Sequence, residues 1–257
     1  MNQEIVFPFS IMPVLFSIGK YNIHSHDFFA FLALLFGLLV YVYFANYFHQ
    51  RNEKNFIIIM AALVWWAIGS RLPIILANFS EIWQNTSNIA SLIDGKTIVW
   101  GLIGGTLSVW AVKRQMGIKK RMWNIIAPAV ALGIAIGRIG CFLGSDAVGT
   151  PTRLPWAVDF WDHILRHPTQ LYESIFCCIV FVYTIYRLLR KNKPQDGEIF
   201  TLFIMLYFTF RFLVEFIRIE PRVFGWLTAY QYAAILVLLY QGIRTWYQKR
   251  IRLSATL

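Results

Sequence analysis

Residues 28–48 read FFAFLALLFGLLVYVYFANYF, and this stretch decides the fold class. It contains no charged residue and has the length of about 20 residues that an α-helix needs to cross a bilayer core. Further segments of the same character follow it along the 257-residue chain. The sequence therefore predicts an all-α polytopic membrane protein with seven transmembrane helices, at Phe28–Phe48, Phe56–Ala77, Thr97–Val112, Trp123–Leu143, Leu171–Leu189, Ile199–Ile217 and Leu227–Tyr247.

The composition supports this class. Hydrophobic residues make up 58% of the chain and charged residues 14%, whereas soluble domains carry about 25% charged residues. The formal net charge is +11, which in a soluble protein would suggest a nucleic-acid partner, but here it agrees better with basic cytoplasmic loops. We therefore expect a single transmembrane domain over residues 1–257 with no nucleic-acid partner, no cofactor and no metal site.

Most basic residues lie in alternate loops, which predicts the orientation in the membrane. By the positive-inside rule the side that carries them is cytoplasmic, so the N-terminus is outside and the C-terminus is cytoplasmic. Residues 5–19 are apolar but too short to span and interrupted by Pro8 and Pro13, and we interpret the segment 1–27 as an interfacial arm. The outer segment 144–168 is rich in Pro, Gly and Trp and is predicted to be a structured, functional loop.

Several ionisable residues fall inside the predicted spans, where each costs about 2.5–3.5 kcal/mol and marks a candidate functional site. They are Arg71, Arg138, Glu173, Arg211 and Glu215. Arg211, Glu215 and Arg218 are spaced to share one helix face. Glu215 can simply neutralise one arginine. The excess of arginines still predicts a positive pocket in the outer half of the membrane, suited to a phospholipid phosphate.

Three motifs are more distinctive than composition. They are GRIGCFLGSDAVG at 137–149, RHPTQLYE at 166–173 and RFLVEFIR at 211–218. Together they resemble the bacterial prolipoprotein diacylglyceryl transferases, over essentially the whole chain. The resemblance implies a multi-pass enzyme of the bacterial cytoplasmic (inner) membrane with its active site toward the outer leaflet. Its partners would be phosphatidylglycerol, membrane lipids and a prolipoprotein signal peptide, whose lipobox cysteine receives a diacylglyceryl group as glycerol 1-phosphate is released.

The resemblance also implies roles for individual residues. Arg138 and Arg211 match the essential arginines of the family, Gly149 matches a motif glycine, and Asp146 stands where the family usually has Glu. The expected substrate-binding residues are Arg71, Asp146, Gly149, Gln170, Tyr172, Glu173, Glu215, Arg218, His26 and Cys141.

The sequence departs from the family pattern at three further places. Cys141 replaces an Asn, His26 replaces a Tyr, and Val99 stands where the family has its catalytic His. We therefore expect His167 to be the replacement base, together with catalytic Arg138 and Arg211. Alternatively, His167 only orients the loop, and the arginine cluster alone activates the thiol. Cys141 is expected to be a small packing residue rather than a covalent nucleophile.

Two other functions remain open from the sequence. One is a related phospholipid-dependent transferase with a different acceptor. The other is a non-catalytic relative that binds anionic lipid or a lipoprotein signal segment. A seven-span transporter is disfavoured, because the charges cluster in the outer half of the membrane and no repeat with broken helices is present.

Overall fold

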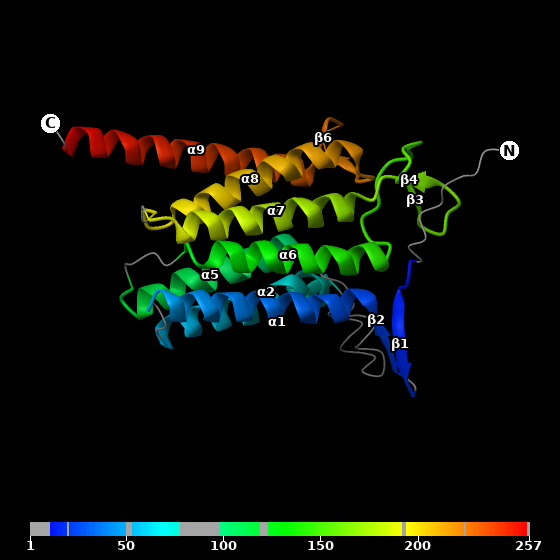
Figure 1. Ribbon diagram of the computed structural model, residues 1–257, viewed down its shortest axis with the longest axis horizontal. Helices are drawn as coiled ribbons and strands as arrows, with labels where there is room; N and C mark the ends of the chain where they lie inside the picture. The colour runs from blue at the N-terminus through cyan, green and yellow to red at the C-terminus, as the bar shows by residue number, and fades with distance from the viewer. Residues whose placement is uncertain are drawn as a thin grey trace. The chain divides into compact units, whose positions relative to one another are not determined.

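The computed structural model describes residues 11–19, 21–49, 53–77, 98–118, 123–191, 194–223 and 225–255 (Figure 1). The contacts divide the chain into two units, one made of residues 1–45 with 122–257 and the other of residues 46–121. Seven α-helices lie within the described residues. They are α1 (Ser25–Tyr47), α2 (Glu53–Ala77), α5 (Ile98–Gln115), α6 (Ile126–Leu143), α7 (Thr169–Leu189), α8 (Glu198–Val214) and α9 (Ala229–Ala255).

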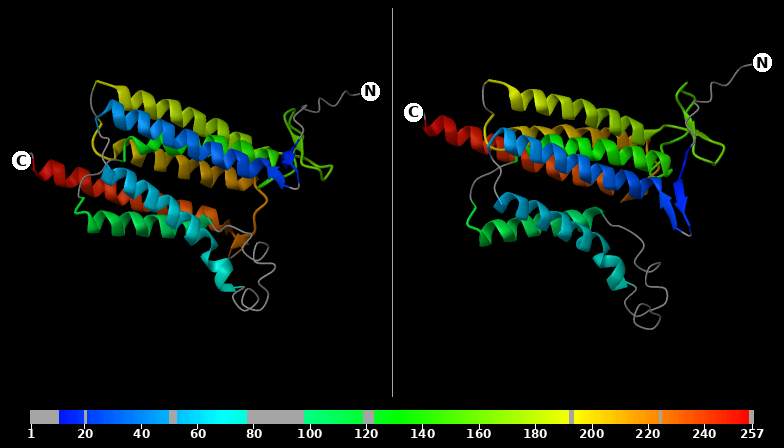
Figure 2. Two further views of the ribbon diagram at one scale, coloured as in Figure 1. Left: turned by 90° about the horizontal axis from the view of Figure 1, so that it is seen from below. Right: turned by 60° about the horizontal axis from the view of Figure 1, so that its bottom comes forward.

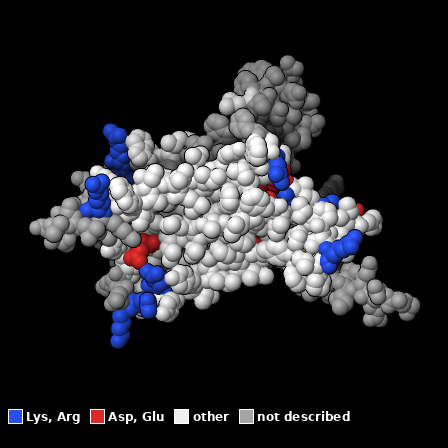
Figure 3. Space-filling view, turned by 90° about the horizontal axis from the view of Figure 1, so that it is seen from above, with Lys and Arg blue, Asp and Glu red and all other residues white. Residues whose placement is uncertain are grey.

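Five of these helices are long and apolar enough to cross a membrane: α1, α2, α6, α7, and α8 with the short 3-10 helix η2 (Glu215–Ile217) that extends it. The other two carry more charge: α5 ends with Lys113 and Arg114, and the C-terminal half of α9 contains Arg244, Lys249, Arg250 and Arg252. In Figure 3 the surface between the helix ends is almost entirely uncharged, and Lys and Arg gather at the ends. The prediction of a mostly helical membrane protein is thus confirmed.

The helix boundaries differ from the predicted spans by a few residues. Helix α1 begins at Ser25 rather than Phe28. There the Ser25 amide donates to the carbonyl of Pro13 at 2.9 Å, and its hydroxyl donates to that of Met12. Helix α6 begins at Ile126 rather than Trp123, since the Ile126 amide closes a turn onto the Trp123 carbonyl at 3.2 Å.

Three antiparallel hairpins accompany the helices, which the all-α prediction did not include. They gather at one end of the larger unit (Figure 1) and are formed by β1 (Val14–Ile18) with β2 (Tyr21–His24), β3 (Val158–Asp159) with β4 (Leu165–Arg166), and β5 (Arg222–Val223) with β6 (Leu227–Thr228). The first lies in the predicted interfacial arm, whose residues 1–10 are outside the described residues. The third occupies the predicted start of the last span, so α9 begins only at Ala229.

Glycines let α1 and α6 approach closely within the larger unit. A Cβ at Gly140 would lie 2.6 Å from the Cβ of Phe29, and one at Gly37 would lie 3.2 Å from the carbonyl oxygen of Ala129. Gly140 has no room for a side chain and Gly37 has little, as expected where small residues set the distance between membrane helices. Helix α6 is also tied to α7, because the Ser174 hydroxyl donates to the Ala135 carbonyl at 2.8 Å.

The smaller unit is an antiparallel pair of helices, α2 and α5 (Figure 2). A Cβ at Gly104 would lie 2.5 Å from the backbone oxygen of Trp65, and one at Gly105 would lie 3.3 Å from that of Ala62. Gly104 and Gly105 of α5 therefore lie at its contact with α2, as is usual where small residues set the distance between membrane helices.

Candidate active site

Two arginines from different helices converge on one carboxylate. Glu173, in the first turns of α7, accepts from Arg138 Nε of α6 at 3.0 Å and from Arg211 Nη1 of α8 at 2.9 Å. Both bonds end on its Oε2 atom, while its Oε1 atom accepts from the Tyr207 hydroxyl at 2.8 Å. The Glu173 side chain is only 3% exposed. A buried carboxylate with these partners joins three helices into one charged network.

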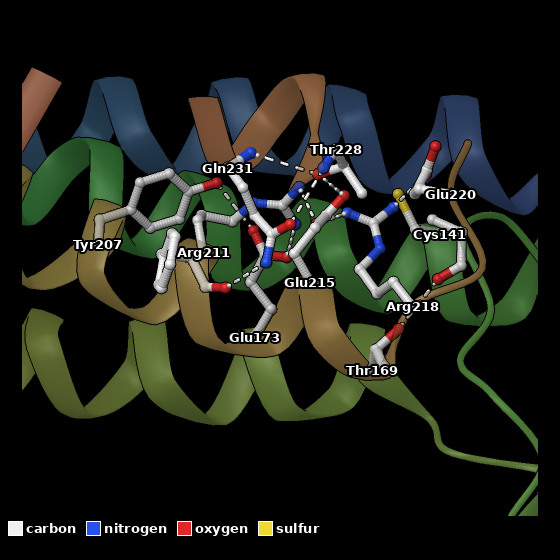
Figure 4. A network of polar contacts seen from close by, with 12 residues as sticks. Cys141, Thr169, Glu173, Tyr207, Arg211, Glu215, Arg218, Glu220, Thr228 and Gln231 are labelled. Carbon is white, nitrogen blue, oxygen red and sulfur yellow. Dashed lines mark hydrogen bonds and ion pairs between the residues drawn. The ribbon is translucent and has the colours of Figure 1, made fainter. Parts of the chain in front are cut away.

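The second carboxylate of the network is Glu215. Its Oε2 atom accepts from Arg211 Nη2 and from Arg218 Nη1, each at 3.2 Å, and its Oε1 atom accepts from the Thr228 hydroxyl at 3.2 Å. The shared face predicted for Arg211, Glu215 and Arg218 is present, although the chain tightens into η2 at Glu215. Figure 4 shows these side chains along α8 and η2, with Glu173 reaching toward them from α7.

The start of α9 closes the network from the other side (Figure 4). The Thr228 amide donates to Gln231 Oε1 at 3.0 Å, and Gln231 Nε2 donates to the Phe212 carbonyl at 3.2 Å. The ring of Tyr230 lies 5.1 Å from the guanidinium carbon of Arg211 and 5.8 Å from that of Arg218. The cation–π contacts hold both guanidinium groups against Tyr230, and the hydrogen bonds hold the start of α9 to the end of α8.

The charges in the described network are nearly balanced. Glu220 accepts from Arg218 Nη2 at 3.0 Å and adds a carboxylate that the sequence argument did not count. The excess of positive charge that the sequence predicted for this pocket is therefore offset by the carboxylate of Glu220 at the edge of the network. Arg138 is the most accessible of the three arginines, with 18% of its side chain exposed, against 7% for Arg211 and 5% for Arg218.

Gly149 joins the outer loop to the network. Its amide donates to the His167 carbonyl at 3.1 Å, and Gly149 also forms a bridge with Arg218. A Cβ at Gly149 would lie 2.5 Å from that carbonyl oxygen and 2.6 Å from the His167 Cβ, so only glycine fits. The adjoining Gln170 is buried, and its Nε2 atom donates to the Asp146 carbonyl at 2.6 Å. Gly149 thus places the loop against the start of α7.

His167 and Tyr172 form a separate polar group. His167 Nδ1 lies 3.2 Å from the Tyr172 hydroxyl, which also accepts from Trp156 Nε1 at 2.7 Å. Within the described residues, no hydrogen bond or ion pair connects this group to Glu173 or the arginines. The arrangement agrees with the alternative in which His167 orients the loop, and its role as a base stays a prediction.

His26, Cys141 and Asp146 come together beside the network. Arg138 Nη1 lies 3.9 Å from the Cys141 sulfur, and the Asp146 amide donates to the Cys141 carbonyl at 2.9 Å. His26, on the first turn of α1, faces both residues. Arg71 belongs to the smaller unit, where its Nη1 atom donates to the Ala67 carbonyl at 3.5 Å.

Some network residues were missed by the sequence argument. Tyr207 precedes Arg211 by one helical turn, so its position on the same face was available from spacing alone. Glu220 and Thr228 lie in the turn and hairpin after η2, where no periodicity indicates which side chains point inward, and Tyr230 lies in the first turn of α9 directly after them.

Comparisons with known proteins show the family to which the chain belongs. The family model described as prolipoprotein diacylglyceryl transferase matches residues 13–247. The chain is 29% identical over 228 residues to the phosphatidylglycerol–prolipoprotein diacylglyceryl transferase of Finegoldia magna, covering 88% of this chain and 91% of that protein. It is 30% identical over 221 residues to the protein of that name from Clostridium tetani (82% and 86% covered), and 34% identical over 211 residues to that from Nitratidesulfovibrio vulgaris (75% and 77% covered). The chain belongs to the prolipoprotein diacylglyceryl transferase family.

Proposed function

We propose that this protein transfers a diacylglyceryl group from phosphatidylglycerol to the lipobox cysteine thiol of a prolipoprotein signal peptide, releasing glycerol 1-phosphate. The names of its relatives give the donor and the acceptor. The observation that carries the proposal is the convergence of Arg138 and Arg211 on Glu173 Oε2 within an apolar helix bundle. Ionisable groups inside a membrane-spanning bundle are costly and therefore mark a functional site.

The proposal includes a seven-span topology in the bacterial inner membrane, with α5 and α9 as spans beside the five more apolar helices. Basic residues at the C-terminal ends of α5, α7 and α9 support a cytoplasmic position for these ends: Lys113, Arg114, Arg187, Arg190, Arg244, Arg250 and Arg252. Glu173 lies at the opposite end of α7 from Arg187. The active site therefore belongs at the outer leaflet, with the N-terminus outside and the C-terminus inside.

Arg138 is the residue we assign to the donor phosphate. In the described part of the chain its side chain has only two polar contacts, Nε with Glu173 and a weak one from Nη1 to the Cys141 sulfur. Its remaining N–H groups are therefore available for a phosphate, which a guanidinium binds in a bidentate way.

The transfer itself forms a bond between the acceptor sulfur and the terminal glycerol carbon of the diacylglyceryl group. The S–H bond of the thiol breaks and its proton passes to water, while the bond from that carbon to the phosphate oxygen breaks and its electron pair leaves with the phosphate. A guanidinium beside that oxygen stabilises the charge that develops in the transition state. Arg138, the most exposed of the three arginines of the network, would supply this stabilisation.

Arg211 acts in this scheme as a positioning residue. It holds Glu173 and Glu215 at once, lies against the Tyr230 ring and is 7% exposed. Glu173 in turn orients the guanidinium of Arg138. Loss of Arg211 would therefore reduce turnover by misplacing Arg138, even though the Arg138 side chain itself is intact.

Two buried polar atoms near the outer loop support a polar ligand at this end of the bundle. Gln170 Oε1 and Ser145 Oγ have no hydrogen-bond partner among the described residues. Buried polar atoms without a partner are rare, because each costs about 1–3 kcal/mol. The hydroxyl groups of a phosphatidylglycerol headgroup would provide partners for both.

The test is mass spectrometry of a synthetic lipobox peptide incubated with the purified protein and phosphatidylglycerol. We expect a diacylglyceryl thioether on the peptide cysteine. Arg138→Ala should lower turnover by about 10²–10³, the usual cost of losing one stabilising donor. Arg222→Ala is the matched control, since this arginine is exposed and its Nη1 atom donates only to the Trp226 carbonyl, at 3.4 Å.

The other outcomes separate the alternatives. Consumption of lipid without modification of the peptide would indicate a different acceptor. Intact lipid bound to the protein, with no product, would favour a non-catalytic relative. Full activity of Arg138→Ala would refute the phosphate assignment.

A further inference from the structure

Three side chains with metal-binding donor atoms lie together at the outer end of α1 and α6. The ligand atoms of His26, Cys141 and Asp146 all lie within 4.8 Å of one another. His26 and Cys141 are partly buried, and Asp146 is exposed at the surface. A ligand can therefore reach the cluster from the aqueous side, while two of its three donors are held by the helices.

The backbone around the cluster keeps these donors close together. A Cβ at Gly140 would lie 3.4 Å from the His26 Cα, and one at Gly144 would lie 3.3 Å from Asp146 Oδ2. Glycine at both positions lets α1 approach the end of α6. The turn closed by the Asp146 amide on the Cys141 carbonyl, at 2.9 Å, brings the carboxylate back toward the thiol.

From this arrangement we infer that His26, Cys141 and Asp146 bind a zinc-class divalent ion and leave one coordination position open. A sulfur, an imidazole nitrogen and a carboxylate oxygen together favour zinc or a similar transition metal over magnesium or calcium. Tetrahedral zinc has bonds of about 2.0–2.3 Å, so its neighbouring donors are about 3.5 Å apart. The donor atoms of the three side chains need to move about 1 Å closer together, and the exposed Asp146 side chain is free to make this movement.

The surrounding charges agree with a divalent cation. A thiolate from Cys141 and the carboxylate of Asp146 bring two negative charges, which match the charge of the ion. Arg138 lies 3.9 Å from the sulfur, but its own charge is paired with Glu173 at 3.0 Å. Asp27 Oδ1 lies 3.6 Å from His26 Nδ1, and a carboxylate beside a histidine is the usual means of orienting a ligating ring.

The open coordination position of the ion can bind the acceptor thiol. This part of the inference rests on the proposed function. A thiol that coordinates zinc loses its proton, here to water at the outer surface, and becomes a thiolate. The sulfur then forms its bond to the glycerol carbon as the bond to the phosphate oxygen breaks. The ion would thus activate the acceptor beside Arg138, and no histidine from residues 97–112, which contain none, is required.

The binding test uses cobalt(II) as a spectroscopic probe for the purified, tag-free protein in detergent. We expect one cobalt ion per chain, with the absorption of a tetrahedral site and a sulfur-to-cobalt charge-transfer band, both displaced by zinc. Cys141→Ser should abolish the charge-transfer band, and His26→Asn should weaken binding at least tenfold, roughly the minimum cost of disturbing a ligand.

Two matched controls stand outside the cluster. Cys178→Ser changes an exposed cysteine on α7, and His163→Asn changes an outer-loop histidine whose side chain is 97% exposed. Both should retain the full cobalt spectrum. No cobalt absorption in the unmodified protein, or a charge-transfer band that survives Cys141→Ser, would overturn the metal site.

The thiol assignment is tested by turnover of the lipobox peptide after chelation. We expect the metal-free protein to lose activity and zinc to restore it. Equal turnover with and without metal would overturn the activating role. Cobalt bound through Cys141 without turnover under any condition would leave the metal site standing and refute the proposed function. Turnover without cobalt binding would support the proposed function and refute the metal site.

Discussion

At the scale of single residues, the feature that stands out is the sharing of Glu173 between two arginines. One carboxylate oxygen accepts from both Arg138 and Arg211, and Arg211 also contacts Glu215, so Glu173 is the only carboxylate among the described residues that pairs with Arg138. The other oxygen is taken by Tyr207. Removing this single charge would leave two arginines facing each other in an apolar environment.

The stability of Glu173→Gln tests this description. Breaking a buried ion pair on one side leaves a buried charge unpaired, and we expect the free energy of unfolding to fall by about 3 kcal/mol. Glu220→Gln is the matched change at the rim, where the carboxylate is 25% exposed, and it should cost under about 1 kcal/mol. Equal midpoints of thermal unfolding in detergent for the two variants would contradict the assignment.

The sequence allowed part of this network to be predicted. Arg138, Arg211, Glu173 and Glu215 were identified because charge inside an apolar helix is rare. Their pairing was not predictable, since it depends on how α6, α7 and α8 are rotated against each other. Glu220 was missed because it follows the end of η2 and shares no helical face with the others.

At the scale of elements, the loop of residues 144–168 is held to the helix bundle by backbone contacts at Gly149 and Thr150. The Thr150 amide donates to the Ile217 carbonyl at 2.8 Å, and the His167 amide donates to the Thr150 carbonyl at 3.1 Å. Residues from the ends of α6, α7 and η2 are thereby joined without any disulfide among the described residues.

Gly149→Ala is expected to disturb this junction. The new methyl group would collide with the His167 carbonyl, and overpacking of this kind costs about 1–3 kcal/mol. Gly242→Ala is the control, because nothing lies within 4 Å of its Cβ position and alanine favours a helix. We expect lost turnover and a lower unfolding temperature for Gly149→Ala only. An unchanged Gly149→Ala protein would show that the loop adapts.

The pairing of the short strands in the hairpins could not be predicted from the sequence. Strands β3 to β6 have only two residues each, which is too short for an alternating pattern to appear. The turns were marked by residues such as Gly225, at φ +80°, but a glycine turn does not indicate which segments pair. The helices, by contrast, were predictable because their apolar runs have the length that a bilayer requires.

At the scale of the whole molecule, the proposed topology can be tested by labelling in intact cells. Trp161→Cys and Asp196→Cys place a cysteine at exposed positions in the loops between α6 and α7 and between α7 and α8. A membrane-impermeant maleimide should label the first and not the second above the level of the parent chain. Labelling of the second in intact cells would reverse the orientation.

The shared carboxylate has a consequence for catalytic turnover under the proposed function. A phosphate that binds the remaining N–H groups of Arg138 meets a guanidinium whose charge is already partly offset by Glu173 at Nε. This internal carboxylate lowers the affinity for free phosphate esters, so we expect the water-soluble product to leave quickly and product inhibition to be weak. The diacylglyceryl donor regains the lost affinity through its acyl chains, which the product lacks. Glu173 thereby helps the site to hold the lipid donor and to release the phosphate product.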